Sequence, residues 1–175
     1  VSHRGRIRVE SARVYSLPPN PPRLVGAAVT ADSARWVGSW ADAMITVFKP
    51  AEEQRKVIDA FREGGGEGKP MLLQAQLSYA PTEDEARRSA YDQWRQSALD
   101  PGVLTELASL ADFDRETASV SPDDLDRSVR ISADLGRHAA WIAEYVEMGF
   151  EETYLHQVGR DQRRFLEEFG EHVLP

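Results

Sequence analysis

Short apolar runs alternate with longer amphipathic segments along most of the chain. The apolar runs span residues 23–29, 43–48, 70–79 and 152–158, and their length and composition are typical of β-strands. After each run, apolar residues recur at three- and four-residue spacing, which is the pattern of a helix with one buried face. The alternation predicts four successive βα units.

Polar residues and glycines mark the expected helix ends. Thr30 or Asp32 can cap the first helix, because a side-chain oxygen at that position accepts a hydrogen bond from a backbone N–H group. Thr82 and Asp134 are placed to do the same for two later helices. The run Gly64–Gly66 predicts the end of the second helix, which begins near residue 51.

Two segments depart from this rhythm. Residues 1–22 carry a basic extended stretch and then four prolines, which predicts an extended lead-in or hairpin. Residues 99–132 contain breaks and short helical stretches, with one helix expected at 101–111, and this predicts a helical insertion. The domain itself is therefore expected to span residues 23–175, with the insertion inside it.

Four βα units in sequence predict an α/β fold with a parallel sheet, because right-handed crossover helices return the chain to the same end of the sheet. The pattern alone leaves a doubly wound sheet and part of a (β/α)8 barrel open. A complete barrel needs about 250 residues, and this chain has 175. A doubly wound sheet that binds nucleotides usually has a glycine-rich first turn, and residues 26–30 offer only Gly26.

Composition narrows the function classes. The chain has no cysteine, which excludes disulfides and thiolate metal sites. Its 21 basic and 29 acidic residues give a net charge of −8, which disfavours binding to nucleic acid. The apolar runs are far shorter than the roughly 20 residues of a membrane span, and the N-terminus has no signal-peptide pattern. We expect a soluble cytoplasmic protein that binds neither nucleic acid nor membranes.

Three histidines and all four tryptophans are not expected to bind a metal or a cofactor. His3, His138 and His172 are predicted at the surface without partners at metal-ligand spacing, so no zinc or iron site is expected. The tryptophans fall on predicted helices outside the sheet, where packing is expected instead of stacking on a cofactor. They are Trp36, Trp40, Trp94 and Trp141.

The segment EMGFEETYLHQVGRDQ at 147–162, followed by a helix, resembles the last βα unit of the luciferase-like oxidoreductases. This family binds flavin mononucleotide (FMN) or the deazaflavin coenzyme F420. The resemblance is closest to its F420-dependent glucose-6-phosphate dehydrogenase branch. The blocks AAVTADSA at 27–34 and WADAMIT at 40–46 are similar to the fifth and sixth barrel strands of the family, although Ala43 stands where glycine is usual. The resemblance covers essentially the whole chain.

The resemblance implies the C-terminal half of a TIM barrel, strands five to eight, with parallel strands and outer helices. It places the family's principal catalytic residues upstream of Val1, so no catalytic residue is assigned in this chain. Four strands cannot close a barrel. We therefore expect the other half-barrel or a second copy of the chain as a partner, a homo-oligomer as the assembly, and no activity from this half alone.

The resemblance also implies cofactor contacts at two places. Its phosphate-binding turn corresponds to Ala28, Val29, Thr30 and Ala31, where the family usually has glycines at the positions of Val29 and Thr30. A helix N-terminus at the end of a barrel strand can hold a phosphate through backbone N–H groups. His156 ends the last strand and could donate to a flavin carbonyl or carry a proton.

Three further residues are candidates for substrate binding. Thr46 and Lys49 correspond to a segment that holds a sugar phosphate in the dehydrogenase branch, but they are displaced by about one position, and a one-residue shift in a strand reverses the face of a side chain. Arg95 falls near a position that supplies a phosphate-binding cation, and Arg127 or Arg130 lies beside another. Glucose 6-phosphate is not expected as the substrate.

Two functional hypotheses follow. The first is part of a flavin- or deazaflavin-dependent oxidoreductase that transfers a hydride to or from a small organic substrate, with FMN or coenzyme F420 as cofactor. The alternative is a non-catalytic half-barrel, a binding or assembly unit that pairs with itself or with a partner chain, since its unpaired strand edges need cover.

Overall fold

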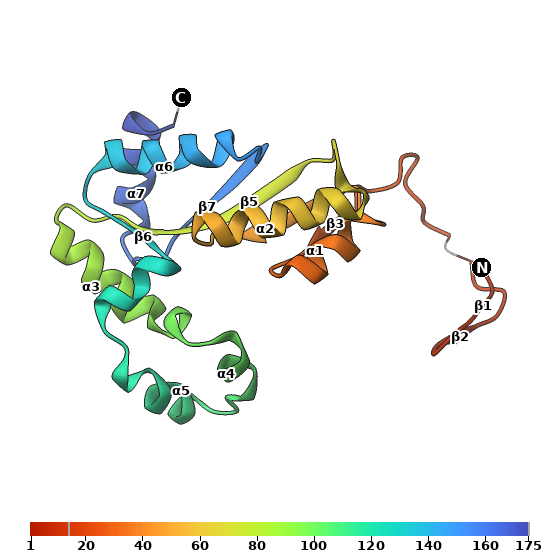
Figure 1. Ribbon diagram of the computed structural model, residues 1–175, viewed down its shortest axis with the longest axis horizontal. Coiled ribbons are helices and arrows are strands. Elements are labelled where there is room, and N and C mark those ends of the chain that lie inside the picture. The colour runs from red at the N-terminus through yellow and green to blue at the C-terminus, as the bar shows by residue number, and fades with distance from the viewer. Residues whose placement is uncertain (14, 175) are drawn as a thin grey trace.

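A parallel sheet organises the computed structural model, which describes residues 1–13 and 15–174 (Figure 1). Its main strands are β3 (Val25–Ala27), β4 (Ala43–Val47), β5 (Met71–Ser78) and β7 (Glu152–Gln157). Each pairs in parallel with the next one along the chain. The short strand β6 (Arg130–Ile131) pairs with the last two residues of β5, on the edge opposite β7.

Strand order separates the two architectures that the periodicity left open. The register runs continuously from Ala27 to Ile45, then to Leu72 and Glu152. A doubly wound sheet reverses its strand order at a switch point and carries helices on both faces, whereas these four strands keep chain order. The α/β class is therefore confirmed, and the arrangement fits four consecutive strands of a barrel.

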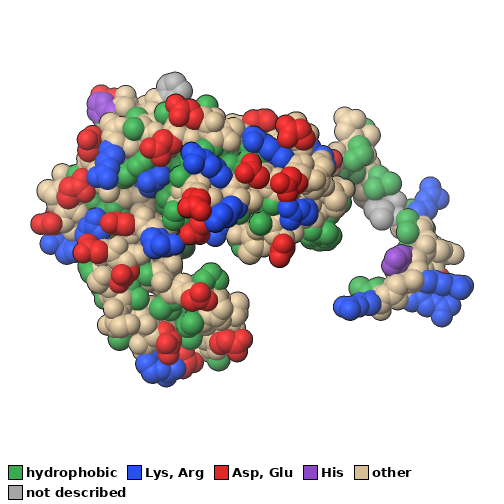
Figure 2. Space-filling model, viewed as in Figure 1, with side chains coloured by type: hydrophobic (Ala, Val, Ile, Leu, Met, Phe, Trp, Pro, Cys, Tyr) green, Lys and Arg blue, Asp and Glu red, His purple; other side chains and the backbone are tan. Residues whose placement is uncertain are grey.

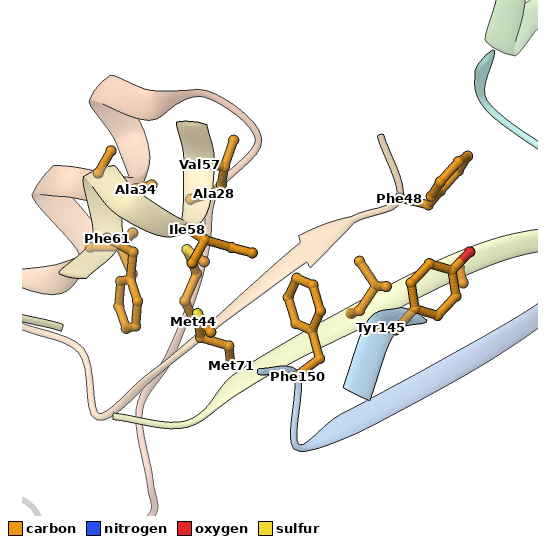
Figure 3. Close-up of a cluster of buried hydrophobic side chains, with 14 of the residues drawn as sticks. Ala28, Ala34, Met44, Phe48, Val57, Ile58, Phe61, Met71, Tyr145 and Phe150 are labelled. Atoms are coloured by element: carbon orange, nitrogen blue, oxygen red, sulfur yellow. The ribbon is translucent and has the colours of Figure 1, made fainter. Parts of the chain in front are cut away.

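Helices cover one face of the sheet, which we call the outer face. They are α1 (Ala31–Gly38), α2 (Ala51–Phe61), α6 (Leu135–Glu147) and α7 (Gln162–His172). Met44 and Met71 point toward this layer, on the side of Phe61 of α2 (Figure 3), and Leu73 and Tyr145 of α6 belong to the same buried cluster. Each large apolar side chain buried there contributes roughly 1.5–3 kcal/mol. The outer face is thus the main hydrophobic core.

The predicted caps form as expected. The side chains of Thr30 and Asp134 accept hydrogen bonds from the first turns of α1 and α6, and Thr82 does so for α3 (Glu83–Trp94). Each cap satisfies a backbone N–H group that has no partner within its helix.

The glycines after α2 do more than end a helix. They lie in a π-helical turn (Arg62–Gly66) that packs on α1. A Cβ atom at Gly64 would overlap the carbonyl group of Arg35, and one at Gly38 would overlap the carbonyl oxygen of Phe61. Gly65 has a φ of 102°, a conformation that glycine adopts without strain. The two backbones approach closely because these side chains are absent.

A helical segment, residues 80–134, separates β5 from α6 and projects from one end of the sheet (Figure 1). We call residues 80–134 the insertion from here on; the insertion predicted from the sequence covered only residues 99–132. Besides α3 and β6 it contains α4 (Pro101–Glu106) and α5 (Leu110–Glu116), where one helix at 101–111 was predicted. Its short 3-10 turns span Arg95–Ala98, Thr117–Ser119 and Pro122–Arg127. The predicted single helix is wrong because Ser109 caps a new helix there.

The insertion has a small hydrophobic core, and hydrogen bonds connect its two ends. Ala86 and Ala90 of α3 pack with Leu125 and Ile131, so α3 belongs to the insertion and not to the outer layer. Glu83 Oε1 accepts hydrogen bonds from Ser132 Oγ at 2.7 Å and from the N–H of Ala133 at 3.0 Å. The two ends of the insertion are thereby joined.

The first residues form a small antiparallel hairpin of β1 (His3–Arg4) and β2 (Arg8–Val9). It extends away from the sheet (Figure 1), and basic side chains gather on it (Figure 2). None of the helices that the structure describes is long and apolar enough to cross a membrane.

His138 is buried, with 1% of its surface exposed, so its predicted surface position is wrong. Its ring packs against Tyr79, Trp141 and Phe169, and Nε2 lies 3.0 Å from the carbonyl oxygen of Ser132. Burial lowers the pKa of His138 below its ordinary value, because the charged form loses hydration, and this outweighs the hydrogen bond to Ser132. His138 therefore favours the neutral state.

The close approach of α1 and the glycine turn predicts opposite effects for two glycine substitutions. Gly64→Ala should lower the free energy of unfolding by about 1–3 kcal/mol, as overpacking does. Gly170→Ala should raise it by up to about 1 kcal/mol, because Gly170 lies within α7, a Cβ there meets nothing within 4 Å, and alanine favours helix. Urea denaturation checks both, and equal effects would contradict the packing described.

The buried imidazole of His138 predicts a pH-dependent stability. The pKa of His138 is lower in the folded state than in the unfolded state, where it is near 6.5. The contribution of His138 to the free energy of unfolding is therefore fully present above pH 6.5 and is lost as the pH falls below that value. The melting temperature should therefore drop between pH 7.5 and 5.5, and His138→Gln should flatten that drop. His172→Gln, at the end of α7, is the control and should leave the slope unchanged. Equal slopes in all three proteins would refute the assignment.

Candidate functional site

The face of the sheet opposite the helices carries the polar side chains of the strands. Because successive side chains alternate between faces, Gln74 and Gln76 of β5 lie on this inner face, while Leu73 and Ala75 lie in the outer core. His156 of β7 pairs with Gln76 and shares that face. The inner face therefore combines amide and imidazole groups near the carboxyl ends of β5 and β7.

Trp94 covers His156. The indole is on α3 at the base of the insertion, and its ring meets the imidazole edge-on with the centroids 4.8 Å apart. His156 Nδ1 is buried and lacks a hydrogen-bond partner in the described residues. Trp94 was predicted on a helix outside the sheet, in a packing role. It lies on α3 as predicted, and it packs against His156 because α3 folds back over the carboxyl end of β7.

Gln76 is a second polar group without a partner. Only 8% of its surface is exposed, and among the described residues its side-chain amide makes no hydrogen bond. Its amide faces the open groove and is not among the fully buried atoms that lack a partner, whereas His156 Nδ1 is. Gln76 and His156 are thus neighbouring polar groups, one open to the groove and one buried behind it.

An open groove of about 600 Å³ lies between the end of β4, the inner face of β5 and the insertion. Its lining includes Lys49, Gln76, Trp94, Leu99, Leu104 and Arg127. Active sites of parallel α/β folds lie at the carboxyl ends of their strands. The groove is therefore the best-placed binding site on this chain.

Thr46 and Lys49 lie in different places. Lys49 lines the groove, and its backbone N–H donates to Gln54 Oε1 at 3.0 Å, which fixes the chain where β4 ends. Thr46 pairs with Leu73, on the outer face, and is 2% exposed. Its Oγ1 has no hydrogen-bond partner in the described residues. The structure brings Lys49 to the groove and leaves Thr46 in the core behind it.

Arg95 turns away from the groove and into the insertion. Its Nε donates to Thr117 Oγ1 at 3.2 Å, and its guanidinium lies 3.3 Å from Asp114 and over the ring of Tyr91. Arg130 stacks on Phe48, 4.4 Å from the ring centroid, and hydrogen-bonds to the Tyr145 hydroxyl. Both arginines are held by other side chains and do not line the groove.

The predicted phosphate turn follows β3. Ala28 is buried in the outer core and its N–H donates to Ile45 O at 3.0 Å, whereas Val29 is 49% exposed. Thr30 has an extended φ of −126°, and its Oγ1 accepts from Ser33 N at 3.2 Å. Ala31 starts α1 and packs against the core. The turn therefore does not require the glycines that the family usually has.

The turn follows the carboxyl end of β3, and His156 lies near the carboxyl end of β7. The register places Ala27 level with Glu152, the first residue of β7, so His156 lies beyond that level along its strand. The N–H groups of Ala31 and Asp32, at the start of α1, have no hydrogen-bond partner in the described part of the chain. Such groups are able to bind an anion.

Sequence reasoning missed Gln76 and Trp94. For Gln76 a signal was present, since Gln74 and Gln76 alternate with apolar residues in the segment MLLQAQLS. In a strand buried on both faces, two polar residues on one side indicate a polar inner surface. The position of Trp94 had no comparable signal, because it depends on how the insertion folds.

The orphaned hydroxyl of Thr46 predicts a stabilising substitution. Thr46→Val keeps the shape and removes a buried group that makes no hydrogen bond, so the free energy of unfolding should rise by about 1 kcal/mol. Thr117→Val is the matched control, because Thr117 is equally buried but its hydroxyl donates to Phe113 O at 2.7 Å. The control should be destabilised. Destabilisation of both variants in denaturant titrations would show that Thr46 has a partner.

Comparison with known proteins gives curated relatives and solved structures. The chain is 27% identical to F420-dependent glucose-6-phosphate dehydrogenase of Microbacterium testaceum, over 95% of this chain and 52% of the relative. The same enzyme of Nakamurella multipartita is 26% identical, with 96% and 52% covered. The chain spans about half the length of these relatives.

Two solved structures have a similar fold. An F420-dependent secondary alcohol dehydrogenase in complex with an F420-acetone adduct matches all of this chain and 55% of its own, with a TM-score of 0.84 and 19% identity. A riboflavin lyase with modified FMN and riboflavin matches all of this chain and 47% of its own, with a TM-score of 0.62 and 18% identity. The family model described as luciferase-like monooxygenase matches residues 1–152. The chain belongs to the luciferase-like monooxygenase family.

Proposed function

We propose that this chain is the C-terminal half of a (β/α)8 barrel in an oxidoreductase that uses coenzyme F420 or FMN and acts on a small organic substrate. Family membership, the four parallel strands in chain order and the half-length match to F420-dependent dehydrogenases support this proposal. The observation that carries it is His156 Nδ1, a buried polar atom that has no hydrogen-bond partner in the described residues and lies next to Trp94 of the groove wall.

The groups that this chain offers fit such a cofactor. The N–H groups at the start of α1, together with Thr30, would hold the cofactor phosphate. Trp94 and His156 would lie along its ring system, with the indole providing an apolar contact. When bound, a flavin or deazaflavin ring supplies the capacity to accept or donate a hydride.

His156 has the chemistry to bind and to position a proton. Its orphaned Nδ1 can donate to a carbonyl or accept from a ring N–H, depending on the tautomer. Trp94 excludes water from one side of the imidazole, which strengthens a hydrogen bond made there. We assign His156 a cofactor-binding role and assign no catalytic residue to this half.

The exposed inner face supports the proposal that another half-barrel covers this one. Val25 is 42% exposed and Tyr154 50% exposed, although both belong to strands of the sheet. In the described residues, β3 and β7 each have one unpaired edge. Exposed apolar side chains and open strand edges favour association with another protein segment. The other half-barrel, in the same polypeptide or in a partner subunit, would cover both.

The open edges also support the second candidate, a non-catalytic unit that pairs with a copy of itself. This unit would form a stable dimer that lacks cofactor absorbance. Size-exclusion chromatography with light scattering and a visible spectrum of the same peak separates the two candidates. A peak with bound flavin or deazaflavin absorbance favours the oxidoreductase.

Cofactor binding tests the oxidoreductase proposal directly. FMN and coenzyme F420 are titrated separately into the full-length protein, and tryptophan emission is recorded. We expect saturable quenching with one of them and a much smaller quench in Trp94→Phe, because Trp94 is the indole next to His156. Trp36→Phe is the control, since Trp36 is 66% exposed on α1 and should leave the quench unchanged.

The role of His156 is tested in the same titration. His156→Leu should weaken cofactor binding about tenfold, the equivalent of one lost hydrogen bond of roughly 1.4 kcal/mol. His172→Leu on α7 is the matched histidine control and should bind as the parent does. The proposal would be overturned if His156→Leu binds the cofactor as tightly as the parent protein does. It would also be overturned if the parent protein binds neither FMN nor coenzyme F420.

A further inference from the structure

Charge is distributed unevenly along the chain. Residues 1–22, which we call the arm, hold four arginines and one glutamate, a net charge of +3. The insertion, residues 80–134, holds 13 acidic and six basic residues, a net charge of −7. All remaining residues together carry only −4. Two segments of opposite sign therefore account for most of the charge asymmetry of the protein.

These two segments lie at opposite ends of the molecule. The hairpin of the arm extends away from one end of the sheet, and the insertion projects from the other (Figure 1). Four prolines within residues 18–22 join the hairpin to β3, and proline-rich segments are semi-rigid spacers of about 3.1 Å per residue. The spacer therefore keeps the arm away from the insertion of its own copy.

The arm carries cations and apolar side chains that need a covering surface. Among the described residues, Arg4 and Arg6 form no ion pair, and no hydrogen bond joins residues 1–13 to the rest of the chain. Ile7, Tyr15 and Leu17 are each at least 73% exposed. A two-stranded hairpin alone is marginally stable in water. An acidic surface with apolar side chains would neutralise and cover it.

The insertion has such a surface. Its helices α4 and α5 have no buried side chain. Leu110 is 84% exposed, Val103 is half-exposed, and Glu106 forms no ion pair with the described residues. Acidic and apolar side chains lie together on this part of the molecule (Figure 2). The insertion is therefore complementary to the arm in charge, and both surfaces contribute apolar contacts.

We propose that the arm of one copy of this chain docks on the insertion of a second copy. A two-fold axis makes the contact reciprocal, so each copy gives one arm and receives one, and the dimer closes. The net charge of −8 makes two copies repel each other elsewhere, which confines their contact to the segments of opposite sign. This dimer does not depend on the cofactor proposed above.

The salt dependence of dimerisation is the first test. Sedimentation equilibrium of the full-length protein should show a dimer at about 0.05 M salt. At about 1 M salt, where the Debye length is about 3 Å, the dissociation constant should rise at least about tenfold. Pairing through the open strand edges buries apolar surface and would not weaken in this way. A monomer at low salt, or a dimer that salt does not weaken, would overturn the proposal.

Two double variants of equal charge assign the contact to the arm. Arg4→Gln with Arg6→Gln should weaken the dimer about tenfold at low salt. Arg55→Gln with Arg163→Gln is the matched control, since both arginines are exposed on helices, and it should stay within about twofold of the parent. Equal dissociation constants for the two double variants would contradict docking by the arm, because only net charge would then matter.

Crosslinking identifies the receiving surface. A photoreactive benzophenone side chain replaces Tyr15, and copies with and without a heavy nitrogen isotope are mixed before illumination. Mass spectrometry should find heavy–light peptide pairs that join position 15 to peptides of the insertion. Crosslinks confined to one copy, or heavy–light pairs only outside residues 80–134, would refute the exchange of arms. Folding is not at risk in this experiment, because Tyr15 is 86% exposed.

Discussion

The pairing of β5 on both edges is the constraint on which the rest of the described structure depends. β5 bonds to β4 and β6 on one edge and to β7 on the other, and all but one of its residues are buried. Its alternation sends Leu73 and Ala75 into the helical layer and Gln74 and Gln76 to the inner face. One strand therefore fixes both the core and the polar groups beside the groove.

Local rules account for what the sequence predicted well. Apolar runs, helical spacing and caps such as Thr30 and Asp134 act over a few residues, so the strands and helices of the sheet could be located in advance. The family resemblance supplied the order of the strands. Lys49 also reached the groove, because a residue that ends a parallel strand lies at the carboxyl edge.

Tertiary packing decided the rest. Thr46 lies only three residues before Lys49, yet the pleat directs its side chain into the core. Trp94 meets His156 through the folding of a segment whose short helices have weak individual signals. His138 is buried because α6 packs on Tyr79 and Phe169, contacts between distant parts of the chain.

The hydrogen bonds between Glu83 and the Ser132–Ala133 turn affect how the sequence of the insertion can vary among related proteins. With both ends anchored at one point, the connecting segment behaves as a closed loop, and doubling the length of a flexible loop costs only about 0.6 kcal/mol. Residues of α4 and α5, which have no buried side chain, can be exchanged, shortened or extended with little penalty for the sheet. Natural variation in these residues can then change which ligand the groove binds, while the sheet and its outer helices keep their ability to fold.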